Sequence, residues 1–171
     1  MKKILLLIIF LSYYFANSQN NIQFKIDSLV SILPKMKNDT AKVSTLNQLA
    51  HYYRNINPDT GIIYGNKAYL LSKKLKWNDG IALSLRAIAV SYTNSSEFDK
   101  ARIYYKKASQ FTSNKKILLL IYRGLGVTYS YQNNNPLGLK FGNLSLKLCE
   151  EVGDKKGEAI ALTNIDRKSV V

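Results

Sequence analysis

Residues 81–92, IALSLRAIAVSY, and residues 118–129, LLLIYRGLGVTY, are two copies of one pattern, and this pattern decides the fold. With a shift of 37 positions, Arg86 aligns with Arg123, and both copies end in tyrosine. Each copy also carries a small residue three positions before that tyrosine. Self-similarity at a fixed spacing is the sequence signature of a repeat architecture. The chain is therefore expected to be built from repeats.

The same pattern occurs at two further places, residues 42–53 (KVSTLNQLAHYY) and residues 158–166 (EAIALTNID). Small residues recur before the final tyrosine of the first three copies: Ala50, Ala89 and Gly126. In the fourth copy Asp166 stands at that position, and burying an unpaired carboxylate there would cost several kcal/mol. We expect the last helix to lie at an open end, either as a polar cap or because the chain continues in a longer protein.

A second matched segment follows each of the first three copies. Small residues align at its start (Gly61, Ala101, Gly138), and aromatic residues align three positions later (Tyr64, Tyr104, Phe141). Apolar and small residues recur at intervals of three and four, which is the period of one helix face. Polar turns separate the segments, and Asn57-Pro58 and Asn135-Pro136 suit an N-cap followed by proline at the first helical position. Each repeat is predicted to be helix, tight turn, helix.

The small residues have a physical reason. Ala50, Ala89 and Gly126 are predicted to lie where the partner helix crosses, opposite Gly61, Ala101 and Gly138. Small side chains let two helix axes approach to about 8–10 Å, while larger residues fill the flanking grooves. A single hairpin cannot bury its own apolar stripe, so neighbouring hairpins must stack.

The pattern resembles the tetratricopeptide repeat (TPR) family. FDKARIYYKKA, residues 98–108, is similar to the consensus of the second helix, and the resemblance covers residues 40–166. It implies an all-α fold, an α-solenoid of stacked antiparallel helical hairpins forming a TPR superhelix. Two features depart from the family: the periods of 37 to 40 residues are longer than usual, and Gly65 and Gly142 replace an aromatic residue.

The expected domain organisation has three parts. Residues 1–18 are a signal peptide, residues 19–38 form an N-terminal capping helix that Pro34 helps to end, and residues 39–171 form the TPR array. The repeats are expected at about 40–78, 79–116 and 117–156, with a partial fourth at 157–171.

The first 18 residues have the composition of a secretory signal. Lys2 and Lys3 precede a 12-residue apolar stretch, residues 4–15, and Ala16-Asn17-Ser18 supplies small residues for cleavage. Twelve helical residues reach about 18 Å, which is short of a hydrocarbon core of ~30 Å. We therefore expect export to the periplasm or another extracytoplasmic space, with an uncleaved N-terminal anchor as the alternative. Membrane contact is expected only if the signal stays uncleaved or the chain is longer.

The chain is strongly basic, with 25 Lys and Arg against 11 Asp and Glu. Removing residues 1–18 takes away two lysines and no acidic residue, so the net charge falls from +14 to +12. Such an excess of positive charge is typical of proteins that bind nucleic acid, so nucleic acid has to be considered as a partner. Export and the scattering of lysines over helix ends and loops argue against that partner. A solvated basic surface is one remaining explanation, and an acidic partner or an anionic envelope surface is the other.

No residue pattern indicates catalysis. His51 is the only histidine, and Cys149, the only cysteine, is about 100 residues away. The cysteine lies on the face of small residues in its helix, which favours a buried structural role. No metal-ligand spacing and no phosphate-binding loop occurs, since Gly124 and Gly126 fall within a helical pattern. We expect no enzyme activity, no cofactor, no metal and no small-molecule substrate.

The resemblance implies which residues bind a partner, because in this family the first helix of each repeat lines the concave groove. Carried over to this sequence, the partner-binding positions are Asn47, His51, Arg54, Arg86, Val90, Thr93, Arg123, Val127 and Tyr131. The three arginines would form a positive groove suited to carboxylates or an acidic peptide. The family's carboxylate clamp of lysine and asparagine is not reproduced. The alternative is that the arginines only cover stacked helices with their methylene stems.

Two functions fit these features. The first is a non-catalytic scaffold that binds a protein or peptide on its concave surface, outside the cytoplasm. The second is the N-terminal sensor segment of a longer signal-transduction protein, because the chain is similar to the extracytoplasmic TPR region of membrane-bound histidine kinases and regulators.

Overall fold

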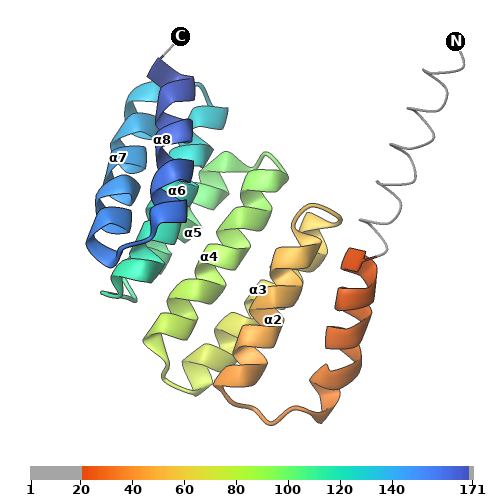
Figure 1. The fold of residues 1–171 in the computed structure, drawn as a ribbon. Coiled ribbons are helices and arrows are strands. Elements are labelled where there is room, and N and C mark those ends of the chain that lie inside the picture. Colours follow the sequence, from red (N-terminus) through yellow and green to blue (C-terminus); the bar gives the residue numbers. More distant parts are fainter. Residues whose placement is uncertain (1–20, 170–171) are drawn as a thin grey trace, which may run out of the picture. The chain divides into compact units, whose positions relative to one another are not determined.

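The computed structural model describes residues 21–169, and within that range the chain is helical with short turns and without strands (Figure 1). It divides into two units, Met1–Lys37 and Asn38–Val171. In the first unit residues 21–32 are helical, and a 3₁₀ helix, η1 (Leu33–Lys35), follows with proline in its first turn. The α-helix thus ends at Ile32, two residues before Pro34. The predicted signal peptide lies outside the described residues.

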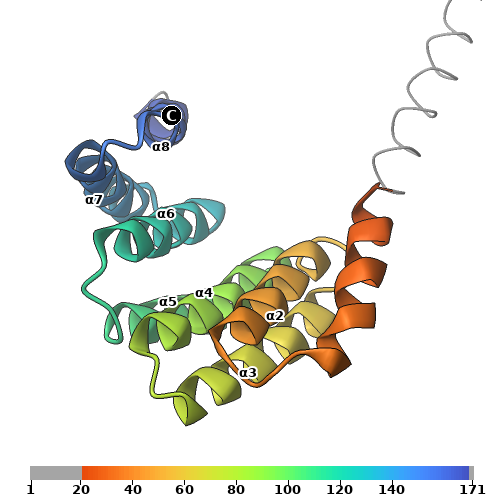
Figure 2. The ribbon, with the colours of Figure 1, turned by 60° about the horizontal axis from the view of Figure 1, so that its bottom comes forward.

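The second unit is a succession of helices. Their bounds are α2 (Thr40–Tyr53), α3 (Pro58–Lys74), α4 (Asn78–Asn94), α5 (Phe98–Ser109), α6 (Lys115–Tyr131), α7 (Asn135–Val152) and α8 (Lys155–Ser169). Each helix packs against the next one, and the order can be followed from orange α2 to blue α8 in Figure 2. In addition α2 packs against α4, α4 against α6, and α6 against α8. The all-α prediction is confirmed.

Small residues lie where paired helices touch. A Cβ atom added to Gly61 on α3 would lie 3.2 Å from the carbonyl oxygen of Ala50 on α2. A Cβ atom added to Gly126 on α6 would lie 3.2 Å from the carbonyl oxygen of Gly138 on α7. In both pairs the two backbones are in van der Waals contact, which a larger side chain would prevent. The predicted close approach is confirmed at these two crossings.

The largest apolar cluster joins α4, α5 and α6. Its buried members include Leu85, Ala89, Ala101, Tyr105, Ile121 and Leu125. Full burial of a side chain such as Leu85 stabilises the fold by about 1.5–3 kcal/mol. Because Ala89 and Ala101 are both fully buried in this cluster, α4 and α5 meet through small residues as well.

The helix caps agree with the sequence prediction in α3 and differ from it in α7. The side chain of Asn57 accepts a hydrogen bond from the Thr60 N–H at 3.0 Å, so Asn57 caps α3 as expected. In α7 the cap is Asn134, which accepts from the Leu137 N–H at 3.3 Å, and the prediction of Asn135 was wrong. Proline is also tolerated at the second helical position, because a backbone N–H at that position would have no carbonyl partner within the helix.

The C-terminal helix α8 packs against α7 and α6. Asp166 on this helix is exposed, as expected for a carboxylate at the position that is small and buried in the earlier repeats. Ile165 contacts α7, because a Cβ on Gly142 would lie 3.2 Å from Ile165 Cγ1.

Candidate ligand-binding surface

The nine residues predicted to bind a partner lie on α2, α4 and α6 or at the end of α2. They line three separate hollows of the second unit, each of which contains one of Arg54, Arg86 and Arg123.

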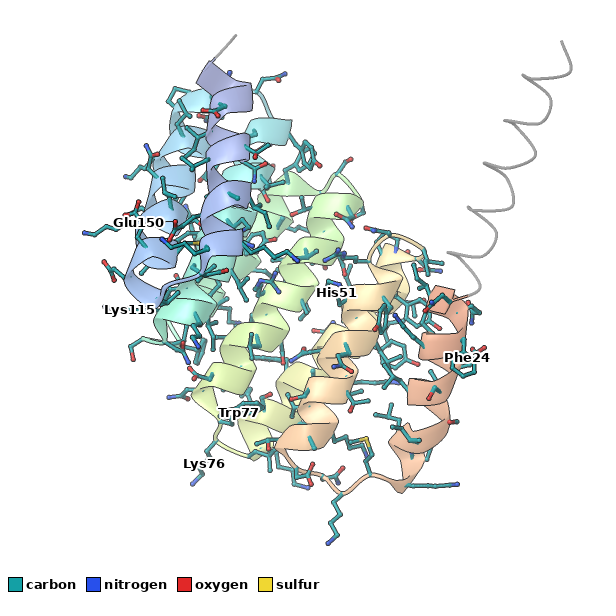
Figure 3. The ribbon with its side chains drawn as sticks, in the orientation of Figure 1. Phe24, His51, Lys76, Trp77, Lys115 and Glu150 are labelled. Atoms are coloured by element: carbon teal, nitrogen blue, oxygen red, sulfur yellow. The ribbon has the colours of Figure 1, made fainter. Side chains whose placement is uncertain are left out.

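The first hollow, the α2–α4 groove, has a volume of about 280 Å³. It brings together four predicted residues: Asn47 and His51 from α2, and Arg86 and Val90 from α4. Figure 3 marks His51 on α2. The groove also contains Ser44 and Gln48, which the sequence analysis missed. Ser44 lies three residues before Asn47 and Gln48 three residues before His51, a spacing that places each pair on the same helical face and that could have been read from the sequence.

The second hollow, of about 450 Å³, lies where α2, α4 and α6 end. It contains the predicted residues Arg54, Thr93 and Tyr131. Tyr131 is largely exposed, and its ring centroid lies 6.1 Å from that of Phe98 on α5. Thr93 is buried, and its hydroxyl lies 3.0 Å from the Thr128 hydroxyl on α6. The Thr93 hydroxyl therefore joins α4 to α6 and does not face an incoming ligand.

The third hollow lies between α6, α7 and α8 and holds Arg123 and Val127. Its volume is only about 10 Å³, which is barely one water molecule. Arg123 Nη2 lies 3.8 Å from Cys149 Sγ and 4.0 Å from a carboxylate oxygen of Asp154. At this end of the unit, packing of α8 leaves little room for a ligand.

Arg86 has no counter-ion within the described part of the chain. No hydrogen bond or ion pair joins it to another described residue, and its Nε is buried without a partner. Burial, together with the neighbouring Arg54 and Arg123, lowers the pKa of the Arg86 guanidinium, although Tyr105 opposes this effect. Arg86 as a whole remains partly exposed, so its guanidinium is a partly desolvated positive charge without a counter-ion, which an anion would stabilise.

Asn47, across the groove, is also unsatisfied. Its side-chain oxygen is buried and has no hydrogen-bond partner in the structure. Asn47 and Arg86 both line the groove, and each has one buried polar atom without a partner, which costs about 1–3 kcal/mol when it is left unpaired.

His51 is held by an arginine. Arg54 donates from Nη1 to His51 Nδ1 at 2.9 Å. Because arginine has only donors, Nδ1 must be the unprotonated nitrogen. Burial lowers the pKa of His51, and the positive charges of Arg54 and Arg86 lower it further. His51 is therefore neutral at pH 7.

Tyr105 belongs to the buried apolar cluster and lines none of the three hollows, although its phenol interacts electrostatically with Arg86. It lies on α5 and is only 2% exposed, yet its ring packs on Gly124 of α6, where any Cβ would collide with it. Burial raises the pKa of the Tyr105 phenol, and the nearby Arg86 opposes this effect. The Tyr105 phenol and the Arg86 guanidinium therefore interact electrostatically. The sequence already distinguishes Tyr105 from its counterparts, because the aligned positions of the other repeats hold Gly65 and Gly142.

Cys149 is buried and is not in a disulfide, as its place among small residues predicted. Between residues 21 and 169 no three His, Cys, Asp or Glu side chains are grouped as metal ligands. No helix in that range combines the length and the apolar character needed to cross a bilayer.

The arrangement offers arginine donors, an amide and a short apolar wall, which together can bind a carboxylate-bearing chain.

No protein-family model matches this sequence, and no curated protein shows significant similarity to it.

Proposed function

We propose that this chain is a non-catalytic scaffold of the tetratricopeptide type that binds a protein or peptide on the surface formed by α2, α4 and α6. The observation that carries the proposal is the α2–α4 groove, where polar and apolar side chains of two successive first helices surround about 280 Å³. The contacts of α2 with α4, of α4 with α6 and of α6 with α8 support a stack of hairpins with one shared inner face.

Binding is proposed to occur outside the cytoplasm. The support is the sequence of residues 1–18, with two lysines, an apolar stretch and small residues at its end. Cell fractionation with an antibody against the mature chain tests this part. Protein that stays in the cytoplasm at full length would contradict export.

Site-specific photo-crosslinking tests the binding surface. A photoreactive residue at Ser44 or Val90, both in the groove, is expected to capture one defined partner in the source cell. The same residue at Lys106, exposed on α5, is the matched control. The partner should appear as one band from the groove positions and not from the control. Equal capture from both surfaces would refute the proposal.

A further inference from the structure

Arg86 differs from the other arginines whose side chains the structure describes. Arg54 donates to His51, Arg102 pairs with Asp99, and Arg123 lies near Asp154 and Cys149. Arg86 has no such partner for its guanidinium, although a buried Nε without a partner is a feature that it shares with Arg123. A guanidinium in this situation binds an anion more strongly than an exposed one does, because the low local dielectric strengthens the attraction.

The surroundings hold Arg86 ready for a ligand. Tyr105, packed against Gly124, interacts electrostatically with Arg86, and Arg86 itself lines the α2–α4 groove. The groove lining contains one arginine, no lysine and no carboxylate. One guanidinium suits one negative charge, which favours a carboxylate over a phosphate group, whose sites gather several donors.

We propose that Arg86 is the centre of a carboxylate-binding site in the α2–α4 groove, and that the ligand is the aspartate or glutamate side chain of an acidic peptide segment. This inference rests on the proposed function and specifies its ligand. His51 in the groove accepts a hydrogen bond from Arg54, which lines the next hollow, so Arg54 offers a second positive charge to an acidic segment bound at Arg86. The net charge, +14 for the full chain and +12 without Lys2 and Lys3, favours an acidic partner over a basic one.

Isothermal titration with defined peptides tests the ligand class. The probes are a 12-residue peptide of alternating glutamate and serine, the same peptide with glutamine for glutamate, free glutarate, and inorganic phosphate. The glutamate peptide is expected to bind, and its affinity should fall by about tenfold from 50 to 200 mM salt, because the charges are screened. Equal binding of the glutamine peptide, or binding of glutarate or phosphate as tight as that of the glutamate peptide, would overturn the proposal.

Two substitutions test the role of Arg86. Arg86→Met keeps the apolar stem and is expected to weaken glutamate-peptide binding by about 30-fold or more. Arg86→Lys keeps the charge but loses the planar fork, so an intermediate loss is expected. Lys106→Met removes the same charge from the exposed face of α5 and should leave the affinity unchanged. Unchanged affinity in Arg86→Met would overturn the assignment.

Ser44→Glu separates ligand binding from folding. Ser44 is exposed and lines the groove, so the chain tolerates a longer side chain there. The new carboxylate is expected to pair with Arg86, raise the melting temperature and block the glutamate peptide. Ser44→Gln, of the same size and uncharged, should do neither. A lower melting temperature in Ser44→Glu than in Ser44→Gln would contradict a carboxylate site at Arg86.

The two proposals fail in different ways. If photo-crosslinking from the groove captures a partner equally well in wild type and in Arg86→Met, the scaffold function stands and the carboxylate site falls. If no partner is captured from groove positions, the scaffold function itself falls, whatever the peptides do.

Discussion

Single side chains decide how closely the helices of this protein approach one another. At the crossing of α2 and α3 the contact is between Gly61 and the backbone of Ala50, and at the crossing of α6 and α7 it is between Gly126 and Gly138. Ala89 has the same role on α4 and is fully buried. These positions could be predicted from the sequence, because a small residue recurs at each of them in register with the repeat.

Ala89→Leu is expected to lower the free energy of unfolding by about 1–3 kcal/mol, because the added carbons have no space between α4 and its neighbours. Urea unfolding followed by circular dichroism measures the effect. Ala159→Leu, on the exposed face of α8, is the control and should change stability little. An Ala89→Leu protein as stable as wild type would show that the helix crossing is placed incorrectly.

The pH dependence of stability should reveal His51. Its pKa in the folded chain lies below the ordinary value of 6.5, because of burial and the charges of Arg54 and Arg86. As the pH falls below about 6.5, the unfolded chain gains a proton that the folded chain does not yet bind, so stability decreases over that window. The melting temperature should therefore drop between pH 7.5 and pH 5.5, and drop less in His51→Gln. An equal drop in both proteins would exclude His51 as the cause.

At the scale of helices, the three-and-four periodicity predicted where the chain is helical, and the asparagine-proline pairs predicted where two helices start. The start of α7 was misplaced by one residue. Three consecutive asparagines, residues 133–135, all have side chains that can cap a helix, and Asn133 takes a left-handed conformation with φ of 55°. That choice depends on how α6 ends, which a local pattern does not show.

Asn134→Ala should therefore cost about 1 kcal/mol of stability, because it removes the hydrogen bond to the Leu137 N–H. Asn135→Ala lies inside the first turn and should cost at most a few tenths of a kcal/mol. Chemical denaturation of the two variants side by side distinguishes them. A larger loss in Asn135→Ala would restore the cap position that the sequence first suggested.

At the scale of the second unit, stability rests on packing, because the chain has one cysteine and it is free. The apolar cluster is centred on α4, α5 and α6, whereas α8 exposes Ile160 and Leu162. Proteins open locally, and the segments with the fewest buried apolar contacts open first.

Rates of amide hydrogen exchange should be lowest in the helices with the most buried apolar contacts. We expect the slowest exchange in α4 and α6 and faster exchange in α8, measured by mass spectrometry on peptic fragments. Leu125→Ala, which removes a fully buried side chain from the cluster, should speed exchange across α4 and α6 together. Slower exchange in α8 than in α4 would contradict a core centred between α4 and α6.

The sequence by itself determined the helices, their pairing and the positions of the small residues, because these depend on periodicity and on chemistry within about 40 residues of chain. It also indicated which helices carry the candidate binding residues. Only the tertiary structure decided that Arg86 has no partner, that Thr93 bonds to Thr128, and that Tyr105 packs on Gly124. The reason is physical: a side chain's partners and its exposure depend on neighbours brought together by packing, and periodicity specifies a helix face but not what the next helix places against it.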